Sequence, residues 1–117
     1  MSAVIDRDRH LNLFEIRQGL AISQERMANL LKVSAKTVTR WEKGTRQPSD
    51  RDVLLRLAKL KEIQELGLRI YTSDGFGEFL NTPLPVFGGR CAFDLLSLGD
   101  YEPVISALAG DYEGAGF

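Results

Sequence analysis

The stretch that decides the fold runs from Ser23 to Pro48 and reads SQERMANLLKVSAKTVTRWEKGTRQP. It contains two helix starts, because Ser23 and Ser34 each precede an apolar run and a serine oxygen accepts hydrogen bonds from the first helical turn. Leu31–Val33 leaves room for a turn of only three or four residues between the two helices. Helices joined so tightly cross at a steep angle, and the stretch therefore predicts a helix-turn-helix.

The second of these helices has one apolar side and one basic side. Val38 and Trp41 face inward at helical spacing, and Gly44 is a typical helix end. The outer side is polar and contains no acid; it consists of Ala35, Lys36, Thr37, Thr39, Arg40 and Lys43. A helix of this kind suits the DNA major groove. The alternative is a helical scaffold whose basic face is merely solvated.

Length and composition set the bounds around this motif. The chain has 117 residues, of which 44% are hydrophobic and 26% are charged, as expected of an ordinary domain or two very small ones. The single cysteine, Cys91, excludes an internal disulfide framework and a cysteine-based zinc site. No apolar run approaches the roughly 20 residues of a membrane span. We expect a cytoplasmic protein without metal, cofactor or membrane contact.

The two parts of the chain differ in charge. Residues 1–66 contain 13 Lys/Arg against 9 Asp/Glu, a net charge of +4, whereas residues 67–117 contain 2 against 7, a net charge of −5. A basic part suits a phosphate backbone, and an acidic part is repelled by one. The asymmetry indicates two parts with different partners.

The remaining pattern predicts an all-α protein of two small domains. In residues 1–66 a first helix covers residues 9–18 and a fourth begins at Ser49 and stops at Gly67. In residues 67–117 we expect short helices at residues 73–80, 91–98 and 100–111. The glycine-rich residues 112–117 are expected to form a flexible tail.

The first part resembles the Xre and phage-repressor family of DNA-binding domains. The positions that carry the resemblance are Ser23–Glu25, Ala28, Val33–Ser34, Val38, Trp41–Gly44 and Pro48. It implies a four-helix domain in which Arg17 of the first helix forms an ion pair with Glu42. It also implies DNA contacts: Gln24, Ser34, Thr37, Lys43 and Arg46 at phosphates, Lys36 and Arg40 at base edges.

A second resemblance lies in the acidic part, at Phe79–Pro83, at Phe87–Leu96 and at Gly99. These residues are similar to the C-terminal domain of the Xre/MbcA/ParS-type antitoxins, which are encoded beside toxins of the RES type. The family commonly has Thr-Pro at Cys91-Ala92, and a cysteine is a poorer helix cap than threonine. We therefore expect a looser start of that helix here.

Together the resemblances imply a homodimeric antitoxin that neutralises an NAD-degrading RES-type toxin and represses its own operon by binding operator DNA. Residues 67–117 would form the dimer and the toxin-binding face. The C-terminal end would lie at the toxin's active site, with Tyr112, Glu113, Gly114 and Phe117 as toxin contacts. No catalytic set of residues is visible in the sequence, and we expect no enzyme. The alternative is a stand-alone dimeric transcriptional regulator of the Xre family.

Overall fold

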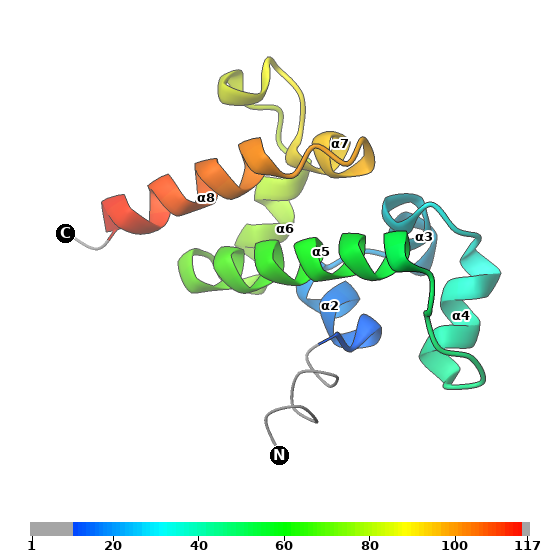
Figure 1. Cartoon of the computed structure of the whole chain (residues 1–117). Coiled ribbons are helices and arrows are strands. Elements are labelled where there is room, and N and C mark those ends of the chain that lie inside the picture. The colour runs from blue at the N-terminus through cyan, green and yellow to red at the C-terminus, as the bar shows by residue number, and fades with distance from the viewer. Residues whose placement is uncertain (1–10, 116–117) are drawn as a thin grey trace.

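The computed structural model describes residues 11–115, and for residues 112–115 it describes the backbone only. Within this range the chain is all-helical, which confirms the predicted fold class (Figure 1). The elements are α2 (Leu13–Leu20), α3 (Gln24–Leu31), α4 (Ala35–Lys43), α5 (Arg51–Ile70), α6 (Ser73–Asn81), the 3-10 helix η1 (Pro85–Phe87), α7 (Ala92–Ser97) and α8 (Glu102–Ala115). Each of these helices is too short or too polar to cross a lipid bilayer.

Helices α3 and α4 form the predicted helix-turn-helix. The Ser23 hydroxyl accepts a hydrogen bond from the Arg26 N–H at 3.1 Å, and the Ser34 hydroxyl accepts one from the Thr37 N–H at 3.1 Å. Between the helices, Lys32 has the left-handed conformation with φ of 63°, and Gly44 ends α4 with φ of 82°. Local cap chemistry therefore sets the ends of both helices where the sequence predicts them.

The first helix differs from the prediction at both ends. It starts at Leu13 because the Asn12 side chain accepts from the Glu15 N–H at 3.0 Å, and it continues to Leu20. Gly19 lies inside the helix, where the Gln64 side chain of α5 packs so closely that a Cβ atom would overlap it. Residues 9 and 10, which the prediction included, lie outside the described residues.

Helix α5 forms the centre of the molecule, with α2 on one side and α8 along another (Figure 1). It is capped by Asp50, whose carboxylate accepts from the Val53 N–H at 3.2 Å, and not by Ser49. The predicted stop at Gly67 is wrong, because the helix continues to Ile70. Gly67 is buried under the Phe76 ring of α6, and a Cβ atom at this position would overlap that ring. The glycine thus permits a close helix contact inside α5.

Helices α6 and α8 pack on α5, and α7 contacts α3. Thr72 caps α6 by accepting a 3.1 Å hydrogen bond from the Gly75 N–H, and α6 begins at Ser73, as the sequence predicts. At the start of α7 the Asp94 carboxylate accepts from the Cys91 N–H at 3.2 Å, so aspartate stabilises the turn that cysteine caps poorly. Helix α8 extends to Ala115, beyond the predicted end at Asp111.

One continuous apolar core joins both parts of the chain. It includes Leu20 and Met27 from the helix-turn-helix part, Leu60 and Ile63 from α5, and Leu108 from α8. A polar link adds to it: Arg26 of α3 donates to the Asn81 Oδ1 at 2.9 Å and lies 4.0 Å from the centre of the Phe93 ring. The boundary that we drew at residues 66 and 67 thus falls within a helix and beside a shared core.

Candidate nucleic-acid interface

The exposed side of α4 is basic, as its sequence predicts. Val38 is fully buried and Trp41 packs against the core, and this fixes the rotation of the helix. The cationic side chains then stand outside: Lys36, Arg40, Lys43 and, in the following loop, Arg46 are all exposed. The structure therefore places the four predicted cations on one continuous helix and its C-terminal loop.

The one acid of α4, Glu42, is turned inward and is held by Arg17. The Arg17 Nε atom lies 2.6 Å from Glu42 Oε2, and its Nη2 atom lies 3.0 Å from Oε1. The Arg17 Nη1 atom also donates to the Ile22 carbonyl at 3.0 Å. The side chains are 17% and 8% exposed, respectively. This bidentate pair connects α2 to α4, and it removes the acid from the surface that carries the cations.

The same contacts change the acidity of both groups. Hydrogen bonding to Glu42 raises the pKa of Arg17 above its ordinary value, although burial acts in the other direction. Burial by itself would raise the pKa of Glu42, but hydrogen bonds from Arg17 and Gln24 outweigh it and lower that pKa. Both groups are consequently held in their charged forms at neutral pH.

Gln24 belongs to the same network. Its amide nitrogen donates to Glu42 Oε1 at 2.8 Å, and its amide oxygen accepts from the Thr39 hydroxyl at 2.8 Å. The side chain is half-buried, with a hydrogen bond at each end of its amide. A phosphate contact by Gln24, as expected from the sequence, therefore requires it to use its second N–H or exchange a partner. Sequence reasoning missed Thr39 as the residue that fixes this orientation.

Ser34 and Thr37 lie at the first turn of α4. The two hydroxyl oxygens are 2.9 Å apart and share a hydrogen bond, while Ser34 also caps the helix. Ser34 is exposed and Thr37 is half-buried. The N-terminus of a helix favours anions, so these hydroxyls lie where a phosphate would be stabilised.

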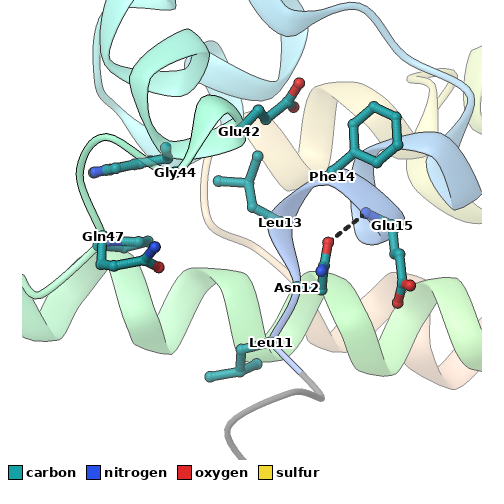
Figure 2. Close-up of a pocket in the computed structure, with 10 residues that line it drawn as sticks. Leu11, Asn12, Leu13, Phe14, Glu15, Glu42, Gly44 and Gln47 are labelled. Carbon is teal, nitrogen blue, oxygen red and sulfur yellow. Dashed lines mark hydrogen bonds between the residues drawn. The ribbon is translucent and has the colours of Figure 1, made fainter.

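A cleft of about 440 Å³ lies beside this network, between the start of α2 and the end of α4 (Figure 2). Figure 2 shows Leu13 of α2 and Glu42 of α4 near one another in its wall, with the Asn12–Glu15 cap at the edge. Its charged lining groups are the carboxylates of Glu15 and Glu42. Neither charged residue of this lining is a cation, and the exposed cations Lys36, Arg40, Lys43 and Arg46 are no part of it.

Comparison with known proteins extends these observations. Residues 13–60 match the helix-turn-helix family, which covers α2 to α4 and the first half of α5. Over 111 residues the chain is 31% identical to the probable mycobacterial cidal antitoxin Rv3188 of Mycobacterium tuberculosis, covering 92% of this chain and 94% of that protein. This chain belongs to the family of mycobacterial cidal antitoxins.

A solved structure supports the fold along nearly the whole chain. A chain in the crystal structure of the M. tuberculosis MbcT–MbcA toxin–antitoxin complex superposes with a TM-score of 0.76 at 20% identity. The match covers 90% of this chain and 94% of that chain. The helices after the helix-turn-helix are therefore part of a shared fold rather than an appendage.

The residues predicted to contact a toxin lie at the end of α8. The backbone of Tyr112, Glu113 and Gly114 continues this helix, in the segment where the sequence predicts a flexible tail. Phe117 lies outside the described residues.

Proposed function

We propose that this chain is a cytoplasmic, non-catalytic antitoxin that works as a homodimer. It binds and neutralises a RES-type toxin that degrades NAD, with its C-terminal end at the toxin active site. Through α4 it binds operator DNA and represses its own operon. The observation that carries the DNA-binding part is the inward Arg17–Glu42 pair, because it leaves cations as the only charged groups on the outer face of α4.

The contacts on DNA divide into two kinds. Lys36 and Arg40 project from the exposed side of α4 and are proposed to contact base edges. We propose phosphate contacts for Ser34, Thr37, Lys43, Arg46 and Gln24, the last through its second amide N–H or after it exchanges a partner. A homodimer then binds a near-palindromic site whose half-sites are about 34 Å apart, or a multiple of that distance.

Two substitutions test this division. Arg40→Ala is expected to relax base preference and to weaken specific binding by about 1–3 kcal/mol. Lys43→Ala is expected to weaken binding to all sequences alike and to reduce the salt slope by about one. Fluorescence anisotropy with specific and scrambled operators across a salt series measures both. If Arg40→Ala keeps the wild-type ratio of specific to scrambled binding, Arg40 does not contact bases.

The acidic C-terminal part supports the toxin-binding role. Its net charge of −5 opposes DNA binding, and the resemblance at Phe79–Pro83 and Phe87–Leu96 is to the antitoxins of RES-type toxins. We propose Tyr112, Glu113, Gly114 and Phe117 as the toxin contacts. Large aromatic side chains are suitable anchors, and the acidic groups suit a basic pocket that binds a dinucleotide pyrophosphate.

A truncation separates the two roles. Removal of residues 112–117 keeps the packed part of α8, which includes the buried Val104 and Leu108. We expect the truncated chain to bind operator DNA as the full chain does and to lose most of its inhibition of the toxin encoded beside it. NAD consumption by that toxin is titrated with each form, and operator anisotropy is measured in parallel. Full inhibition by the truncated form removes the C-terminal end from the mechanism. If the full chain binds operator but never inhibits the toxin, it is a stand-alone regulator.

A further inference from the structure

A groove of about 480 Å³ lies between the first half of α5 and the turn that connects α7 to α8. Leu55 of α5 and Leu98 at the end of α7 are both part of its wall, and they are 57% and 67% exposed. The other lining residues are Asp52, Arg56, Lys59, Gly99 and Tyr101. Two large apolar side chains left more than half exposed in one recess are typical of an interaction surface.

We infer that this groove binds a second copy of the chain and forms the interface of the homodimer. The inference rests on the homodimer in the proposed function and goes further, because it places the interface on α5 as well as on the C-terminal helices. We call this surface the dimer groove, and it consists of the seven lining residues just named.

The shape of the dimer groove suits a copy of itself. A twofold dimer uses the same patch on both chains, so the patch must contain both a projection and a recess that accepts it. Leu98 is exposed at the C-terminal end of α7, and the recess lies directly beside it. Around a twofold axis, Leu98 of each copy can therefore enter the recess of the other.

The charges around the groove are also self-complementary. Arg56 and Lys59 are basic and Asp52 is acidic, while Glu102 lies 3.4 Å from the Lys59 ammonium group at the groove's edge. A patch of a single charge sign repels its own copy, whereas a mixed rim can pair across the twofold axis. This balance distinguishes the dimer groove from the outer face of α4, whose charged groups are all cations.

The position of the dimer groove fits the requirement for DNA binding. Asp50, the cap of α5, lines a small cleft together with Arg40 and Trp41, so the start of α5 adjoins α4 (Figure 1). The molecule measures 42 × 34 × 24 Å, and half-sites are separated by about 34 Å. A contact near the start of α5 keeps the two α4 helices close to the twofold axis.

Sedimentation velocity of the full chain tests the interface. We expect the wild type to be a dimer, and we expect Leu98→Glu and Leu55→Glu each to raise the dimer dissociation constant by about 30-fold or more, as loss of a central apolar contact does. Leu98→Met keeps the apolar bulk and is expected to keep the dimer. Val86→Glu is the matched control, because Val86 of η1 is 69% exposed but is no part of the groove. Circular dichroism melts of each variant establish that it is folded.

Three outcomes overturn the inference. They are a monomeric wild type, a Leu98→Glu variant that dimerises as tightly as Val86→Glu, and a Leu98→Glu variant that stays dimeric but no longer inhibits the toxin. The last result would assign the groove to the toxin. Because sedimentation requires no toxin, failure of toxin neutralisation by the wild type would refute the proposed function and leave the dimer measurement intact.

Discussion

In the helix-turn-helix part, α2 meets α4 through charged and polar side chains, whereas in the C-terminal part α5 meets α6 through aromatic rings. The first junction is the network of Arg17, Glu42 and Gln24. The second is a stack in which Tyr71 lies 6.5 Å from Phe76 and 5.5 Å from Phe79, measured between ring centres. Both junctions hold helices together, but they respond to different conditions.

The difference follows from what each part must present outside. Helix α4 keeps a basic surface, and its one acid is neutralised beneath that surface by a bidentate arginine. The three rings of the aromatic junction are uncharged, and beside them the Tyr71 hydroxyl donates one hydrogen bond to Asp111 Oδ2 at 3.3 Å, so the stability of this junction depends mainly on packing and apolar burial. Low pH, or removal of one charged side chain, should therefore destabilise the first junction, and added side-chain volume should destabilise the second.

The largest effect is expected from removal of the network's acid. Glu42→Ala leaves the Arg17 guanidinium uncompensated beside an apolar core, and we expect a loss of about 3 kcal/mol in the free energy of unfolding. Urea melts of Glu42→Ala, of Arg17→Ala and of the double variant measure the coupling between them. The control is Glu102→Ala, because its pair with Lys59 is exposed and should change stability by less than about 0.5 kcal/mol. Additive effects of the two network substitutions would contradict the pairing.

Acid tests the same junction without deleting a side chain. The folded-state pKa of Glu42 is lowered, so its contribution is complete above the unfolded value of about 4.3 and is lost as pH falls through the folded value. Wild type is expected to lose more stability than Glu42→Gln over that interval. Urea midpoints from pH 7 down to pH 3 provide the comparison. Parallel curves would show that the pair contributes nothing to acid sensitivity.

The aromatic junction should fail through excess volume. Gly67→Ala places a Cβ atom inside the Phe76 ring, and we expect a net loss of about 2 kcal/mol although alanine favours helix. Gly110→Ala is the matched control, since no neighbour lies within 4 Å of a Cβ atom at that helical position. That variant should gain about 0.5–1 kcal/mol. Thermal melts of the pair separate packing from helix propensity, and equal gains in both would contradict the close contact.

The comparison also explains which features could be predicted from the sequence. Caps depend on residues three or four positions apart, so Ser23, Ser34 and Gly44 could be identified directly from the pattern. The partnership of Arg17 and Glu42 came from resemblance to a family, because a separation of 25 residues carries no local signal. Its presence in the structure depends on the crossing of α2 and α4.

Other features depend on contacts that composition does not reveal. Gly67 appeared to be a helix stop, but its role is set by Phe76, which reaches it only after the chain turns back at Thr72. Gln24 appeared free to contact phosphate, yet Thr39 and Glu42 hold it from a different helix. The glycines after Asp111 predicted a tail, whereas the backbone continues as helix to Ala115.

The smallest expected effect concerns backbone strain, which also differs between the two parts. Among the described residues, the left-handed positions after residue 67 are glycines: Gly88, Gly89 and Gly99. In the helix-turn-helix part, Ala21 and Lys32 adopt this conformation with φ of 58° and 63°. A non-glycine residue in this conformation is destabilised by about 1–2 kcal/mol, and substitution by glycine removes that cost. Glycine also raises the conformational entropy of the unfolded chain, which offsets part of the gain in stability. Lys32→Gly should therefore raise the free energy of unfolding by about 0.5 kcal/mol.

Lys32→Ala removes the same charge but retains Cβ, and it should show no such gain in urea melts. If Lys32→Ala and Lys32→Gly raise the free energy of unfolding equally, the gain comes from removal of the charge and the turn carries no strain.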